Sequence, residues 1–321
     1  MNQKDNAHSA TTDGLTISPS LDFVSEAAHV PAENSIVDRR VVRLCGIAIL
    51  IGAAASVAAV LLVRLIAFVT NLAFYHRFSF LETSPAQNGM GIWVVLVPVV
   101  GGLIVGFMAR YGSQAIRGHG IPEAMEQVLV NDSRIPARLT FLKPVSAAIS
   151  IGTGGPFGAE GPIIATGGAL GSLFGQLTHI TPAERKTLLA AGAAAGMAAT
   201  FGSPVSAVLL AVELLLFEFR ARSIIPVALA SATAAGLRLL LTGTAPIFEM
   251  TAVAPVTLPG LAFYTVLGVV LGLIAVGVTR AVYAIEDAFD HLPIHWMWWP
   301  ALGAVAVGVV GYFAPNTLGV G

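Results

Sequence analysis

The sequence predicts an all-α, polytopic membrane protein, and its composition carries that prediction. Of the 321 residues, 55% are hydrophobic and 11% are charged, whereas soluble domains carry about 25% charged residues. The mean hydropathy is +0.80, and apolar runs recur along most of the chain. The formal net charge of −1 gives no electrostatic basis for binding nucleic acid. The single cysteine, Cys45, excludes an internal disulfide and a thiolate metal cluster.

The first 40 residues differ from the rest. Residues 1–40 are acidic and rich in Ser, Thr, Asn and Pro, and they lack the basic region and short apolar stretch of a signal peptide. We interpret them as an N-terminal tail, mobile or folded as a short surface helix. The transmembrane domain is predicted to occupy residues 41–321.

Five long apolar runs predict membrane-spanning helices, because about 20 helical residues cross a hydrocarbon core of ~30 Å. Arginines gather before the first run and are scarce in the loops at 75–91 and 244–256. Since basic residues favour the cytoplasmic side, we expect a cytoplasmic N-terminus. The runs are 41–73, 92–109, 223–243, 257–282 and 297–314.

A different pattern occupies residues 118–218, where shorter apolar pieces are interrupted by Gly, Pro and single charges. Helices that cross only half of the membrane and meet near its middle fit this pattern, since irregular backbone is tolerated there only where it lines a cavity. The pieces are 144–157, 161–177, 187–201 and 204–217.

The first interruption has the sequence G-H-G-I-P-E at 118–123. Glycine and proline just before a helix expose free backbone N–H groups at its positive end, which favours an anion site. A simple glycine turn between two helices is the alternative.

The second interruption, residues 154–162, places one carboxylate, Glu160, in a glycine-rich break that opens a new helix. An ionisable group at membrane depth is a functional hypothesis by default. The alternative is a loop acid that caps the helix, which the helix dipole also favours.

A third break, residues 201–204, precedes a helix that ends at Glu213, where an interfacial carboxylate is the simpler reading. The histidines show no metal-ligand spacing, and no nucleophile motif occurs, so neither a metal nor a cofactor is predicted. Trp296, Trp298 and Trp299 are explained by an aromatic belt at the membrane interface.

The order of these motifs resembles the CLC family of chloride channels and proton-coupled anion exchangers. Gly158–Pro162 is similar to the family's G-[KR]-E-G-P, and Gly118–Pro122 to its G-S-G-I-P. Lys143 falls where the family commonly has a lysine. The resemblance runs from about Val41 to Gly321.

The resemblance implies a homodimer in the cell (inner) membrane, with one pore per subunit for chloride or another small anion. Each pore is built from two inverted repeats of tilted and broken helices. The first repeat would cover about 41–243 and the start of the second about 257–321, which leaves the second repeat incomplete. Gly321 precedes the family's G-x-F-x-P motif and its pore tyrosine, so we expect a fragment or a truncated product.

For the site, the resemblance implies that Glu160 is the gating glutamate. As a carboxylate it would occupy the outer anion site, and once protonated it would swing away. Burial would make its protonation state switchable. Glu213 is a candidate proton relay. The anion-binding residues implied are Gly118, His119, Gly120, Ile121, Pro122, Gly158, Ala159, Gly161 and Pro162.

The sequence departs from the family at three of these positions. His119 stands where the family usually has a serine, and Ala159 replaces a Lys or Arg beside the gate. Exchangers often carry an inner glutamate at the position of Leu214, and Glu213 lies one residue, or about 100° on an ideal helix, away. Two alternatives stay open: a non-conducting membrane fragment, and an intramembrane enzyme with His119 and Glu160 as an acid–base pair.

Overall fold

The computed structural model describes residues 39–118, 120–178, 180–244 and 257–319, and these residues form helices and loops without any strand. Five of the helical segments are long and apolar enough to span a membrane, which confirms the predicted multi-pass, all-helical architecture. The predicted tail lies almost wholly outside the described residues. The five segments are Arg39–Tyr75, Gly91–Gly112, Ala221–Thr242, Leu258–Asp290 and Trp296–Phe313.

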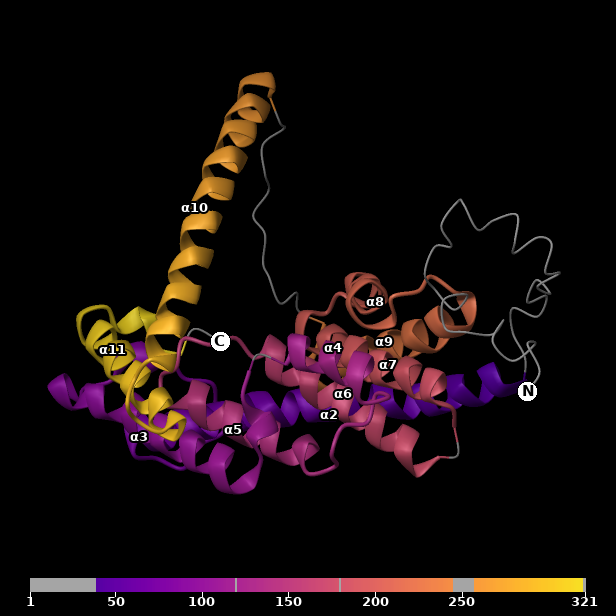
Figure 1. Cartoon of the computed structure of the whole chain (residues 1–321), viewed down its shortest axis with the longest axis horizontal. Helices are drawn as coiled ribbons and strands as arrows, with labels where there is room; N and C mark the ends of the chain where they lie inside the picture. The colour runs from indigo at the N-terminus through magenta and orange to yellow at the C-terminus, as the bar shows by residue number, and fades with distance from the viewer. Residues whose placement is uncertain (1–38, 119, 179, 245–256, 320–321) are drawn as a thin grey trace.

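Helix α2 (Arg39–Tyr75) runs along the long axis of the molecule (Figure 1). Its 37 residues correspond to about 55 Å of helix, well beyond the ~30 Å of a hydrocarbon core. Gly52 of α2 packs directly on the backbone of α9 (Ala221–Thr242), because a side chain there would collide with the main chain of Ala230.

Helices α6 (Glu160–Leu177) and α7 (Pro182–Phe201) form the centre of the packed region, with α7 also lying against α2 and α9. Gly167 and Gly192 face each other so closely that a Cβ on either would collide with the other's carbonyl group. Small residues of this kind let helix backbones approach within membranes.

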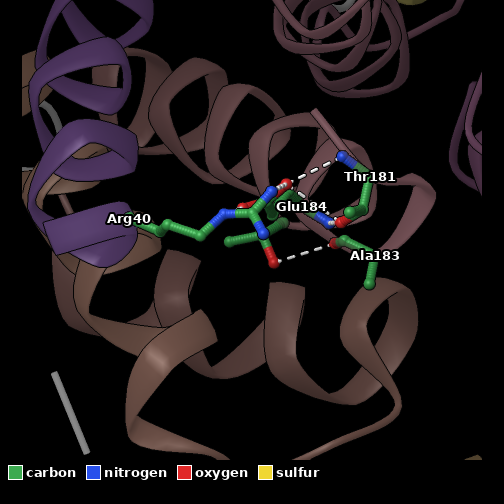
Figure 2. Close-up of polar contacts among 5 residues, drawn as sticks. Arg40, Thr181, Ala183 and Glu184 are labelled. Atoms are coloured by element: carbon green, nitrogen blue, oxygen red, sulfur yellow. Dashed lines mark hydrogen bonds and ion pairs between the residues drawn. The ribbon is translucent and has the colours of Figure 1, made fainter. Parts of the chain in front are cut away.

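The start of α7 differs from the sequence prediction, which began this apolar piece at residue 187. Thr181 and Glu184 form a reciprocal cap: the Glu184 N–H donates to Thr181 Oγ1 (3.2 Å), and the Thr181 N–H donates to Glu184 Oε2 (2.7 Å). Arg40, at the start of α2, also pairs with Glu184 (Figure 2), with Nε to Oε1 at 3.0 Å. The polar first turn therefore belongs to the helix, because the Glu184 carboxylate is paired there with both the Thr181 N–H and Arg40.

The shorter helices are α4 (Ile121–Val130), α5 (Leu139–Gly152) and α8 (Pro204–Ala211), the last continued by the π-helical turn η8 (Val212–Leu216). The sequence placed the piece corresponding to α5 at 144–157, five residues too late. Its true start contains Thr140 and the buried Lys143, so apolarity alone did not reveal it.

At one end of the molecule, α11 (Trp299–Phe313) packs on α3 (Leu96–Phe107) (Figure 1). Helix α10 (Leu258–Asp290) connects to this end and extends away from the packed helices (Figure 1). None of its 33 residues is buried.

Candidate functional site

The two glycine-rich breaks that the sequence singled out lie against each other. Gly120 precedes α4 with φ +100°, a conformation that glycine adopts at little cost. A side chain at Gly120 would collide with the carbonyl group of Gly161, the second residue of α6. The starts of α4 and α6 are therefore in backbone contact, so the positive ends of both helices are brought to one place.

Lys143 of α5 holds the loop before α4. Its Nζ donates to the carbonyl oxygens of Ile116 (2.9 Å), Arg117 (3.3 Å) and Gly118 (2.9 Å), and the residue is only 6% exposed. An ammonium group has three donors, so all three are used on this loop. A buried positive charge therefore lies next to the first break and fixes its backbone.

Glu123 is a site residue whose part the sequence reading missed. Its carboxylate accepts the N–H of Gly120, so one donor at the start of α4 is satisfied within the chain. The signal was present in the sequence, because an acidic residue three positions after the residue that precedes a helix commonly folds back in this way.

Glu160 is the first residue of α6. Its carboxylate lies so close to Gly158 that a side chain at that glycine would collide with it. Glu160 is exposed among the described residues, whereas the sequence predicts that it is buried.

A cavity of about 660 Å³ connects these groups, and we call it the gate cavity. Its walls come from the starts of α4 and α6, from α5 and from the segment that begins α11. Glu160 is the sole acid among its described lining residues, and Arg117 and Lys143 are its cations. Other lining residues that matter here are Gly118, Ile121, Ser146, Gly158, Gly161, Pro162, Trp296 and Trp299.

A second cavity, of about 500 Å³, is lined by Gly120, Glu123 and Glu126 among others. Lys143 and Arg117 line both cavities. The loop before α4 thus contributes to both cavities, which share the two cationic residues.

The remaining predicted anion-binding residues are placed less favourably. Pro122 and Ala159 are not among the lining residues of the gate cavity, and Ala159 packs instead against the hydrophobic core. His119 lies outside the described residues.

From the sequence, Trp296 is interpreted as part of an aromatic belt. In the structure the Arg117 guanidinium lies over its ring, 4.8 Å from the ring centre. That tryptophan is a wall of the cavity, which a sequence alone could not indicate because the contact is long-range.

Glu213 lies in the π-helical turn η8 and is exposed, whereas the adjacent Leu214 is half-buried and lines a small apolar cavity with Ile121 of α4. The ideal-helix angle of 100° does not apply in this turn, because i→i+5 bonds replace i→i+4 bonds. Glu213 nevertheless does not share the direction of Leu214.

Comparison with known proteins agrees with this architecture. Residues 101–321 match the family described as "Voltage gated chloride channel". The "Chloride channel protein CLC-f" of Arabidopsis thaliana is 29% identical over 241 residues, which cover 70% of this chain and 30% of that protein. The "H(+)/Cl(-) exchange transporter ClcA" of Salmonella newport is 30% identical over 228 residues, covering 67% and 47%. The chain thus spans less than half the length of these two relatives.

Solved structures show the same fold at low identity. A slow cyanobacterial Cl−/H+ antiporter has a TM-score of 0.72 at 21% identity, over 86% of this chain and 64% of that one. A CLC-type fluoride/proton antiporter has a TM-score of 0.68 at 18% identity, over 86% and 66%. The family match over residues 101–321 covers more than half of the chain and contains both glycine-rich breaks and the helices that they open, so the chain belongs to the CLC family.

Proposed function

We propose that this chain forms part of a transmembrane pathway for chloride or another small anion, with Glu160 as its gate. The observation that carries the proposal is the gate cavity: two helix starts, Lys143 and Arg117 face a space whose sole acid among the described lining residues is Glu160. Helix N-termini and cations favour an anion. A carboxylate in the same space competes with that anion until it is protonated.

The glycines of the two breaks support the same role. The close approach of Gly120 to Gly161 requires that Gly120 has no side chain, so the starts of α4 and α6 stay together beside the cavity. We assign anion contact to Gly118, Ile121, Gly158, Gly161 and Pro162, which line the gate cavity. His119, between Gly118 and Gly120, is proposed to set the preferred anion where the family usually has a serine.

The gate is tested by Glu160→Gln in liposomes that hold the full-length protein. The amide mimics the neutral carboxyl group, so we expect anion flux in the variant to be equal at neutral and acidic pH, while flux through the unchanged protein rises with acidity. Glu286→Gln on α10, which also removes one exposed carboxylate, is the matched control and should keep the original pH dependence. An unchanged pH response in Glu160→Gln would contradict the proposal.

Both a channel and a proton-coupled exchanger fit this gate. Strict exchange needs a second titratable group on the path of the proton, because an unaccompanied charge in the apolar region is costly. Glu213 is our candidate for that relay, although Leu214 is the neighbour that faces inward. Proton uptake driven by an anion gradient alone distinguishes the two modes.

We propose that the protein works as a homodimer in the cell (inner) membrane, with its N-terminus in the cytoplasm. The resemblance to the family supports the dimer, and the arginines Arg39, Arg40 and Arg43 before the first span support the orientation. Crosslinking in membranes and protease accessibility of the N-terminus test the two statements separately.

A further inference from the structure

A second polar cleft lies away from the gate cavity, at the start of α2 and the start of α7. It has a volume of about 560 Å³, and its polar lining consists of Arg40, Arg134, Gln176, Thr178, Thr181 and Arg185. We call it the arginine cleft. It shares no lining residue with the gate cavity, so the transport proposal does not account for it.

Arg185 is the residue that points to a ligand. It is 5% exposed, and its Nη1 donates to the main-chain oxygen of Asp132 (3.3 Å). Its Nε is buried and has no hydrogen-bond partner among the described residues. A buried donor of a charged group that is left unpaired costs free energy, so an acceptor that enters the cleft would remove this cost.

The charges around the cleft do not cancel. The guanidinium of Arg40 binds both oxygens of Glu184, which neutralises that acid (Figure 2). Arg134 repels Arg185 electrostatically, while Asp132 attracts it. The exposed side chain of Arg134 has no hydrogen-bond or ion-pair partner among the described residues. With Arg40 and Glu184 paired, the guanidinium groups of Arg134 and Arg185 are opposed by the single carboxylate of Asp132. The cleft therefore keeps a net positive charge.

The position of the cleft indicates the kind of anion. Arg40 is the second residue of α2, a spanning helix, so the cleft lies near one membrane surface and not at mid-membrane. Basic pockets between transmembrane helices at this depth suit phosphate-bearing headgroups. The planar guanidinium fork also matches the oxygens of a phosphate group, and the volume far exceeds that of one halide ion.

We propose that the arginine cleft binds a phosphate group, carried either by an anionic lipid headgroup or by a free phosphate compound. One phosphate oxygen would accept from Nε of Arg185, and the others from Arg134. The ligand would thereby link the α4–α5 loop to the start of α7 and replace the repulsion between the two arginines with attraction.

The test measures thermal unfolding of the purified full-length protein in a neutral detergent. Inorganic phosphate is compared with chloride at equal ionic strength, and phosphatidylglycerol with phosphatidylcholine in the micelles. We expect one or both phosphate probes to raise the unfolding midpoint. Arg134→Gln should raise the apparent dissociation constant of that probe about tenfold, the loss of one charge-assisted hydrogen bond.

Arg138→Gln is the matched control, because it removes an exposed arginine from the same loop but outside the cleft, and it should bind like the unchanged protein. Stabilisation by phosphatidylglycerol alone would identify a lipid site, and stabilisation by inorganic phosphate alone a site for a soluble compound. If neither probe stabilises the protein, or if Arg134→Gln and Arg138→Gln weaken binding equally, the proposal is wrong. Neither result would affect the role of Glu160.

Discussion

Helices α7 and α10 lie in opposite environments. In α7 every residue from Thr187 to Gly196 is buried, whereas α10 has no buried residue. Yet α10 is the one that qualifies as a membrane span, because its charged residues all follow an uncharged apolar stretch, while α7 carries three charged residues in its first turns. The buried stretch of α7 thus consists mostly of small residues that allow close contact, whereas α10 leaves large apolar residues exposed among the described residues.

The largest expected effect comes from adding bulk where the backbones touch. Gly192→Leu should prevent α6 and α7 from packing, because its Cβ would already collide with the carbonyl group of Gly167. We expect a cost of about 3 kcal/mol or more, seen as loss of the monodisperse peak in size-exclusion chromatography. The control is Gly272→Leu in α10, which has no atom within 4 Å of the added Cβ. Equal losses in the two variants would contradict the comparison.

Truncating a leucine should have a smaller but still unequal effect. Leu188 of α7 is 0% exposed and packs with Leu44 and Ile51 of α2. Leu188→Ala should cost about 2 kcal/mol, at the low end for buried leucines, because lipid is as apolar as the protein interior. Leu271→Ala in α10, where the leucine is 54% exposed, should change the free energy of unfolding much less. Denaturation in mixed micelles measures both, and similar values would show that α10 packs against protein.

Loss of a helix cap gives the smallest effect of the three. Thr181→Ala should cost about 1 kcal/mol, because it removes the acceptor for Glu184 N–H at the start of a packed helix. Thr257 caps α10 in the same manner, accepting from Gly260 N–H at 3.3 Å. Thr257→Ala should fray α10 locally and leave the global unfolding midpoint unchanged, since no described residue buries that end of α10. If Thr257→Ala shifted the unfolding midpoint as much as Thr181→Ala, the expected difference between the two helix caps would be wrong.

The sequence predicted the spans well because each is a continuous apolar run, and apolarity alone decides whether a segment enters lipid. It failed at the starts of α5 and α7, where Lys143 and Glu184 are accommodated by partners distant in the sequence. The two glycine-rich breaks were found because glycine and proline mark helix starts locally. The contact between the two breaks, the hydrogen bonds of Lys143 and the place of Trp296 in the cavity wall all depend on tertiary packing. The local sequence carries no signal for such long-range contacts.

The charged first turns of α7 also bear on how the chain is assembled during synthesis. A segment that carries Glu184, Arg185 and Lys186 is a poor substrate for independent insertion, since each charge opposes transfer into the bilayer. Helix α2, which is made earlier and inserts readily, offers Arg40 to Glu184 and an apolar face to Leu188. Helix α7, which packs on α6 next to the gate cavity, is therefore expected to depend on a preceding span for its entry, so a defect in α2 should appear first as a biogenesis failure at the translocon and only secondarily as a loss of transport.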